Sequence, residues 1–261
     1  MTNQISDWDY NALKALYRNT FAESDAVAEE ILGYARAYGE IRFLKEDGAV
    51  ATMLCLTELE NGLKYLFAAA TNLDYRKKGL FAKNLSLSVN PNENVVCIPE
   101  QKELFDLYDR LGFTRHGYVL QVSIDGDGSF INKSNAPLRQ LYNIYRNGLF
   151  RPKKPEELFY STIRCHILYG GTVICGDDYY ALCERKNGRS YIYELCVPAG
   201  EEERLPGIIK GCTLGETTVR LPSEYAAILK EHNIPYGKKK LFALKSSILD
   251  ANDLYINLLY N

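Results

Sequence analysis

The chain has 261 residues, enough for one large domain or two small ones, and its 46% hydrophobic and 25% charged residues are ordinary for a globular protein. Its 31 basic and 33 acidic side chains give a formal net charge of -2, so we expect neither nucleic acid nor an anionic membrane as a partner. The first ten residues lack the apolar core of a signal peptide, and the apolar runs are too short to span a bilayer. These features predict a soluble, cytoplasmic protein.

Seven cysteines occur at wide spacings, without a Cys-x-x-Cys pair, and several lie in alternating apolar runs. This pattern favours reduced, buried thiols in a reducing compartment. The three histidines, at positions 116, 166 and 232, are scattered, so we expect no zinc or other metal site.

The first half predicts two helices, three strands, a basic loop, and then a helix, a strand, a helix and a strand. Ser6 and Ser24 precede segments with apolar residues at helical spacing and can cap the two helices. The turn Asn61-Gly62 indicates a hairpin between two of the strands. The strands are expected at 41–44, 49–57, 63–71, 95–98 and 113–124, and the later helices at 80–87 and 100–111. The run Asp125-Gly126-Asp127-Gly128 is the best candidate for a linker.

The second half repeats parts of the first in the same order. Leu13–Tyr17 is similar to Leu138–Tyr142, and Val96–Pro99 is similar to Val219–Pro222. A second strand–turn–strand pattern surrounds Asn187-Gly188. We therefore predict a tandem duplication, with halves at residues 1–130 and 131–261.

The basic loop Tyr75-Arg76-Lys77-Lys78-Gly79 joins a predicted strand to the beginning of a predicted helix. Unpaired backbone N–H groups and the helix dipole attract an anion at such a place. Gly79 has no side chain to block the approach of a phosphate, and the three cations before it add positive charge. A solvated basic turn would have the same composition, but a pyrophosphate would suit this loop.

The segment Ala69–Ala82 resembles the acetyl-CoA-binding motif of the GNAT superfamily of N-acetyltransferases. Leu107–Phe113 resembles its second signature, a tyrosine four residues before Gly-Phe. The closest resemblance is to the bacterial branch with a second GNAT-like half, which includes aminoglycoside- and lysine-acetylating enzymes. It implies an α/β fold (α+β by some conventions) with two halves, each a mixed central sheet flanked by helices.

The resemblance also implies a set of site residues. The cofactor is acetyl-CoA, with no metal, and the catalytic residue is Tyr108, which should face the sulfur. Arg76 is the basic residue of the motif. Backbone groups of Ala69, Ala70 and Thr71 should pair with the pantetheine arm, and those of Lys77, Lys78, Gly79, Leu80, Phe81 and Ala82 should hold the pyrophosphate. Two positions depart from the usual pattern: Phe81 replaces Gly or Ala and could narrow the phosphate pocket, and Gln101 replaces Asn.

The expected chemistry is the direct attack of an amine on the thioester carbonyl. An alkyl ammonium, with a pKa of about 10.4, must first lose a proton to a carboxylate or to water held by one. Tyr108 can then act as general acid for the departing thiolate, whose parent pKa is near 8.5. Tyr108 could equally be an ordinary core tyrosine. Glu58 and Glu100 are candidates for the base, and neither is assigned.

The second half departs from the motif at its corresponding loop, where Glu201-Glu202-Glu203 would repel a pyrophosphate. By a sequence offset of 123, Glu231 stands at the position of Tyr108 and Pro235 at that of Gly112. We therefore expect a degenerate copy that could complete a shared sheet, wall the acceptor pocket or mediate homo-oligomers. The acceptor is expected to be a small-molecule amine or an amine of a protein or peptide. The alternative function is a catalytically inactive CoA-binding or regulatory module.

Overall fold

The computed structural model describes residues 5–99, 101–131, 136–246, 249 and 254–256. It divides into two compact units. The first comprises Met1–Thr114, Ala243–Ile248 and Tyr260–Asn261, and the second comprises Arg115–Phe242 and Leu249–Leu259. Compactness thus groups residues 115–130 with the second unit, whereas the predicted halves place them in the first.

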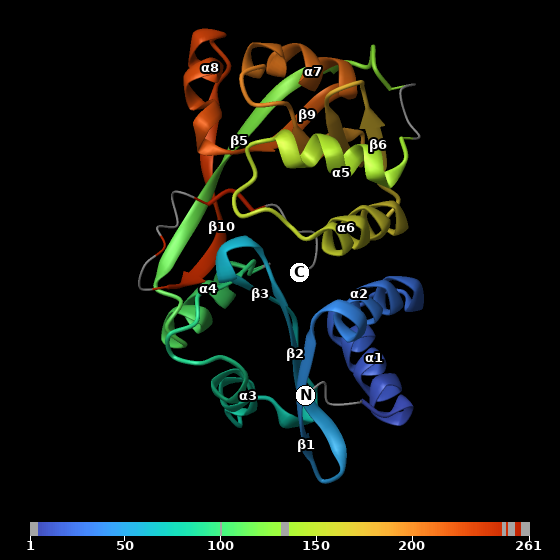
Figure 1. The fold of residues 1–261 in the computed structure, drawn as a ribbon, viewed down its shortest axis with the longest axis vertical. Helices are drawn as coiled ribbons and strands as arrows, with labels where there is room; N and C mark the ends of the chain where they lie inside the picture. The colour runs from blue at the N-terminus through green and yellow to red at the C-terminus, as the bar shows by residue number, and fades with distance from the viewer. Residues whose placement is uncertain (1–4, 100, 132–135, 247–248, 250–253, 257–261) are drawn as a thin grey trace. The chain divides into compact units, whose positions relative to one another are not determined.

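The first unit begins with two helices (Figure 1). The predicted serine caps of both are present. The hydroxyl of Ser6 accepts from the N–H of Asp9 at 3.1 Å, and that of Ser24 accepts from the N–H of Val27 at 3.2 Å. The helices are α1 (Asp7–Phe21), α2 (Asp25–Tyr38), α3 (Leu80–Ser88) and α4 (Lys102–Arg110). The strands are β1 (Glu40–Glu46), β2 (Ala49–Glu58), β3 (Lys64–Thr71) and β4 (Val95–Cys97), joined by the end of β10 (Tyr236–Lys245).

The second unit contains the rest of β10 and a second set of helices and strands. Its helices are α5 (Leu138–Asn147), α6 (Glu156–Leu168), α7 (Leu205–Cys212) and α8 (Ala226–Glu231). Its other strands are β5 (Arg115–Asp127), β6 (Thr172–Cys175), β7 (Tyr180–Lys186), β8 (Arg189–Cys196) and β9 (Leu214–Leu221).

The two units pair their strands in the same pattern. In the first, β1, β2 and β3 are antiparallel, β3 and β4 are parallel, and β4 is antiparallel to β10. In the second, β6, β7 and β8 are antiparallel, β8 and β9 are parallel, and β9 is antiparallel to β5. The strand that follows the parallel pair in each unit therefore comes from the other half of the sequence. This mixed α/β architecture confirms the predicted fold class.

The predicted linker at Asp125–Gly128 is wrong, because its first three residues form the end of β5. Asp125, Gly126 and Asp127 pair with residues 216, 215 and 214 of β9. A Cβ atom at Gly126 would lie 2.3 Å from the carbonyl oxygen of Thr213. The glycine is therefore explained by the close approach of two backbones.

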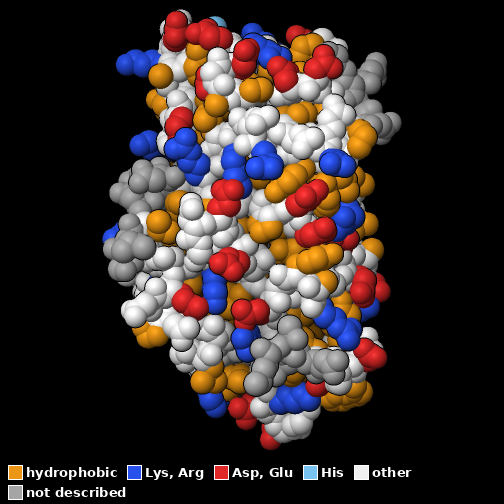
Figure 2. Space-filling model, viewed as in Figure 1, with side chains coloured by type: hydrophobic (Ala, Val, Ile, Leu, Met, Phe, Trp, Pro, Cys, Tyr) orange, Lys and Arg blue, Asp and Glu red, His pale blue; other side chains and the backbone are white. Residues whose placement is uncertain are grey.

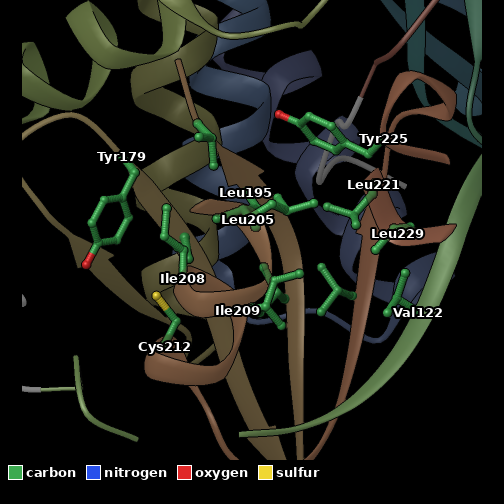
Figure 3. Close-up of a cluster of buried hydrophobic side chains, with 14 of the residues drawn as sticks. Val122, Tyr179, Leu195, Leu205, Ile208, Ile209, Cys212, Leu221, Tyr225 and Leu229 are labelled. Carbon is green, nitrogen blue, oxygen red and sulfur yellow. The ribbon is translucent and has the colours of Figure 1, made fainter. Parts of the chain in front are cut away.

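In the first unit, helices pack on both faces of the strands. Side chains of β2, β3 and β4 meet α3 and α4 in one buried cluster, which includes Leu66, Leu85 and Phe105. On the opposite face, the rings of Tyr34 (α2) and Phe67 (β3) lie 6.4 Å apart. In the second unit, α7 and α8 bury a larger apolar cluster with β5–β9 (Figure 3). On the face shown in Figure 2, basic and acidic side chains are interspersed, in keeping with the balanced charge.

Candidate functional site

The centre of the candidate site is a groove where β3 and β4 part. The two strands pair only between Lys64–Leu66 and Val95–Cys97. β4 ends at Cys97, and β3 continues to Thr71 without it as a neighbour. A hollow of about 50 Å³ opens at this point. Its lining includes Phe67, Ala68, Ala69, Cys97, Ile98 and Tyr108. The structure thus brings the predicted Tyr108 and Ala69 to one groove in the first unit.

A β-bulge turns the backbone of β3 at the groove. Cys55 lies opposite Phe67 and Met53 opposite Ala70, so two residues of β3 face Leu54 alone. One of these two, Ala68, has a φ of 50°, in the left-handed region. A bulky or β-branched side chain would clash with the backbone in this conformation. A small residue thus occupies the left-handed position of the bulge.

The bulge is followed by peptide groups that alternate in direction. The N–H of Asn72 donates to the carbonyl of Ala51 on β2 at 2.9 Å, and the carbonyl of Ala70 accepts from the Thr52 hydroxyl at 2.9 Å. Since successive residues of a strand direct their backbone groups to opposite edges, those of Ala69 and Thr71 point away from β2. These two of the three predicted backbone partners therefore point to the edge where β4 has parted from β3.

Tyr108 lies on α4 with only 6% of its surface exposed. Its ring packs edge to face against Phe113, with centroids 5.2 Å apart, and its hydroxyl interacts with the Cys97 thiol. Burial, and secondarily Cys97, raises the pKa of Tyr108 well above its usual value near 10. The hydroxyl is therefore protonated at neutral pH and is able to act as a hydrogen-bond donor.

The basic loop leads into α3 through an open, left-handed backbone. Gly79 is the N-cap of this helix with a φ of 73°, and a Cβ atom there would meet nothing within 4 Å. Lys77 also has a positive φ, 62°, and no side chain caps the helix. Alternating left-handed residues before an uncapped helix direct several N–H groups into one concave surface, which suits an anion.

The three cations of the loop are exposed and are not neutralised by carboxylates in the described part of the chain. The guanidinium Nε of Arg76 donates to the carbonyl of Thr71 at 3.1 Å. The Lys78 ammonium lies 4.8 Å from the centroid of the Tyr75 ring. Arg76 is therefore held close to the end of β3, and the positive charge of the loop is available to an anion.

Phe81 and the candidate bases were the uncertain members of the predicted set. The Phe81 ring packs against the core cluster and lies 6.1 Å from that of Tyr108, edge to face. Glu58 is exposed at the end of β2 and pairs with Lys64 across the strands, so it does not line the groove. Glu100 lies outside the described residues. Gln101 is the N-cap of α4 and makes no side-chain capping bond.

The second unit has no tyrosine at the place that corresponds to Tyr108, and the structure corrects the offset expected from sequence. In the first unit the N–H of Phe113 donates to the carbonyl of Tyr108 at 2.9 Å, after a left-handed Gly112. The same bond joins Ile234 to Leu229 at 2.8 Å, after a left-handed Asn233. The counterpart of Tyr108 is therefore Leu229 rather than Glu231, because the second half is two residues shorter here than the sequence match implied.

The loop after β8 also differs from the basic loop after β3. The Glu202 carboxylate accepts from the N–H of Gly200 at 2.9 Å. Arg204 pairs with Asp178 through two N–H groups and with Glu201 at 3.5 Å. The Gly200 N–H group, which could otherwise bind an anion, thus already donates to a carboxylate of the same loop. The surface of this loop is therefore negative rather than positive.

A larger hollow of about 410 Å³ lies between α1 and the beginning of β2. Trp8, Ala12, Leu73 and Arg76 are among the residues that line it. Arg76 is the only titratable side chain in this lining among the residues described. The hollow therefore offers no acid or base, and the groove at Tyr108 is the stronger candidate for catalysis.

Three further features concern the cysteines, possible metal ligands and the length of the helices. The seven cysteines all lie in the described ranges, and each is a buried thiol outside any disulfide. No group of three or more His, Cys, Asp or Glu side chains in those ranges could hold a metal ion. Of the helices that can be described, none is long and apolar enough to cross a membrane.

Comparison with known proteins gives a fold but no close relative. No family model matches the sequence, and no curated protein matches it. Among solved structures, Eis1 from Mycobacterium abscessus is similar, with a TM-score of 0.65 and 12% identity over 92% of this chain and 72% of that chain. A GCN5-related N-acetyltransferase from Anabaena variabilis gives 0.63 and 12% identity, over 92% and 71% of the chains. Another, from Kribbella flavida, gives 0.63 and 10% identity, over 92% and 69%. The chain therefore has the fold of the GCN5-related N-acetyltransferases, or GNAT fold, as the sequence resemblance implied.

Proposed function

We propose that the chain is an acetyl-CoA-dependent N-acetyltransferase whose catalytic groove lies in its first unit. The observation that carries the proposal is the position of a protonated, buried tyrosine in a groove that begins where two parallel strands part. The GNAT fold supports it, because this groove follows the strand that carries the acetyl-CoA-like motif.

The cofactor is proposed to lie along β3 and reach the N-terminus of α3. The segment from Arg76 to Ala82 forms a cationic, uncapped helix start that would bind the pyrophosphate. Between these two residues the segment contains Lys77, Lys78, Gly79, Leu80 and Phe81. The backbone groups of Ala69 and Thr71 that point away from β2 would pair with the pantetheine arm, while the Ala70 carbonyl is already engaged by Thr52. The acetyl thioester would then reach the hollow beside Tyr108.

Acetyl transfer requires one bond to form and one to break. The neutral amine nitrogen attacks the carbonyl carbon, the new C–N bond forms, and the C–S bond breaks as electrons move onto sulfur. The proton lost by the amine passes to water or to a base that we do not assign. The Tyr108 hydroxyl has a pKa raised well above 10, and a thiol has a pKa near 8.5, so complete proton transfer to the thiolate is uphill. As the general acid, Tyr108 would therefore act mainly by donating its proton in a hydrogen bond as charge develops on sulfur.

The acceptor is proposed to be an amine, either of a small molecule or of a protein or peptide. The test is incubation of the full chain with acetyl-CoA and a panel of polyamines, amino sugars and lysine peptides, followed by mass spectrometry of the amines. We expect at least one acetylated product and equimolar CoA. The Gly79→Asp variant should form less product at a limiting concentration of acetyl-CoA, while Gly48→Asp, at another exposed turn with φ of 79°, should match the wild type. Binding of acetyl-CoA with no transfer to any amine would instead favour the inactive CoA-binding module.

A further inference from the structure

Two cations of the second unit, Arg220 and Lys239, form no ion pair with a carboxylate among the residues that the structure describes. Arg220 lies on β9 between Val219 and Leu221, which both face the core cluster under α7 and α8. Because strand residues alternate between faces, the Arg220 side chain lies on the opposite face. Its guanidinium carbon lies 5.5 Å from the centroid of the Tyr193 ring on β8, and Gln121 of β5 is its direct cross-strand neighbour. The three side chains therefore share one face of the strands.

Lys239 of β10 supplies the second cation, close enough to interact electrostatically with Arg220. Burial lowers the pKa of Arg220, so its surroundings disfavour the charged guanidinium. Neither cation forms an ion pair with a carboxylate in the described part of the chain. The Glu184 carboxylate on this face accepts instead from the Tyr193 hydroxyl, at 2.5 Å.

The fold itself does not require an arginine at this position. Arg220 follows the last paired residue of the parallel β8–β9 ladder, Val219. In the first unit the residue that follows the last paired residue, Cys97, is Ile98. The first unit therefore has an apolar side chain at the corresponding position. The presence of an arginine at position 220, with the free-energy cost of partly desolvating its guanidinium, needs another explanation.

An oxyanion supplies that explanation. A guanidinium that stacks one face on a tyrosine keeps the N–H groups along its edge directed outward in a planar fork, which fits the two oxygens of a carboxylate or phosphate. Gln121 is exposed and carries a further donor at the same face, and the exposed Lys239 adds positive charge that interacts with Arg220. We propose that Arg220 and Lys239 form a binding site for a small oxyanion, a carboxylate or a phosphate group, in the second unit. The proposal does not depend on acetyl transfer.

The test uses the melting temperature of the full chain, measured while sodium chloride is replaced by sodium phosphate or sodium acetate at constant ionic strength. A ligand that binds the folded chain raises its stability with the logarithm of its concentration above Kd. We expect a rise for wild type with at least one anion, and the anion with the lower half-saturating concentration identifies the source as phosphate or carboxylate. Arg220→Gln and Lys239→Gln should each raise that concentration by about tenfold or more. Lys186→Gln, which removes an exposed positive charge elsewhere in the unit, should leave it unchanged.

The stability of Arg220→Gln in chloride separates binding from a structural role. If the arginine is an unneutralised cation, its loss should leave the melting temperature in chloride equal to or above that of wild type. If Arg220 serves only to pack on Tyr193, the variant should melt lower in every buffer and keep the wild-type response to anions. That pattern would overturn the proposal, as would a wild-type chain that responds to neither anion. Should Arg220→Gln fail to fold, the response of Lys239→Gln, whose side chain is exposed, decides the matter alone.

Discussion

The rings of Phe81 and Tyr108 lie edge to face, with their planes at 90° and their centroids 6.1 Å apart. Phe81 belongs to the first turn of α3, immediately after the basic loop, and Tyr108 belongs to α4. This contact links the backbone proposed to hold the pyrophosphate to the hydroxyl proposed to meet the sulfur. It also explains why the large side chain at position 81 is compatible with the motif, because its ring packs toward the core cluster.

The role of Tyr108 is tested by Tyr108→Phe. The ring contacts are kept and only the hydroxyl is lost, so the melting temperature should change little. We expect kcat to fall by about 10²–10³-fold, the usual contribution of one hydrogen bond donated to developing negative charge, with acetyl-CoA affinity nearly unchanged. Steady-state kinetics and thermal unfolding on the same preparation provide both readouts.

A matched control is available at another buried tyrosine of the same unit. The Tyr34 hydroxyl is 2.7 Å from that of Thr57, so Tyr34→Phe breaks a structural hydrogen bond. It should cost about 1–3 kcal/mol of stability with turnover per folded molecule unchanged. If Tyr108→Phe behaves in the same way as this control, Tyr108 is a core residue and its catalytic assignment is wrong.

The second unit contains a buried ion pair whose removal should be costly. Lys154 and Glu194 are joined at 2.9 Å with only 1% of either side chain exposed, and Tyr180 donates to the other carboxylate oxygen at 2.5 Å. Lys154→Met leaves a buried, uncompensated carboxylate and should cost about 3–5 kcal/mol. Combining it with Glu194→Leu should restore a large part of the loss. Urea denaturation would show this coupling, and simple additivity of the two changes would contradict it.

Stability should fall as the pH rises above about 8.5, the ordinary pKa of a cysteine thiol. Burial raises the pKa of Cys55, Cys97 and Cys196 in the folded chain. The unfolded chain therefore loses these protons at a lower pH than the folded chain does. The unfolded state then binds fewer protons, and each such thiol reduces stability by about 1.4 kcal/mol per pH unit.

Urea denaturation at pH 7, 8.5 and 9.5 measures this slope. Replacing Cys55 with Ala should make it shallower, whatever the change does to stability at pH 7. A stability that is constant or rises over this range would show that the thiols are not protected in the folded chain.

The sequence was most informative where the signal is local. Serine caps, Asn-Gly turns and helical spacing act within a few residues, and they placed α1, α2 and the hairpin of β2 and β3 correctly. Left-handed Asn61 and Gly62 show why that turn was readable, since Asn and Gly tolerate such a backbone at little cost. The basic loop and the groove tyrosine were likewise found from a short motif.

Strand partners and the alignment of the two halves could not be predicted in this way. Alternating residues from Arg115 to Asp127 indicate a strand, but nothing in them specifies β9 as the neighbour, because register depends on residues about 90 positions away. Arg220 was missed for a similar reason. Its significance depends on Tyr193, Gln121 and Lys239, which only the folded chain brings together.

The second unit is expected to lack a cofactor site of its own, because Glu202 occupies its loop and Leu229 replaces the tyrosine. We propose that it is a degenerate copy of the first unit. If so, removing the acidic charge of the loop, as in Glu202→Gln, should leave acetyl-CoA binding unchanged in affinity and stoichiometry. A second bound acetyl-CoA in this variant would show that the acidic loop alone blocks the site.

The most direct test of the central claim is calorimetric titration of the wild-type chain with acetyl-CoA, beside Gly79→Asp and its control Gly48→Asp. We expect one acetyl-CoA per chain for wild type and control. Gly79→Asp should bind at least about tenfold more weakly, a loss of about 1.4 kcal/mol or more, because a carboxylate would fill the open approach to α3 and repel the phosphates. Undiminished affinity in Gly79→Asp, two acetyl-CoA molecules per chain, or no binding to wild type would contradict the assignment of the cofactor to this loop and groove.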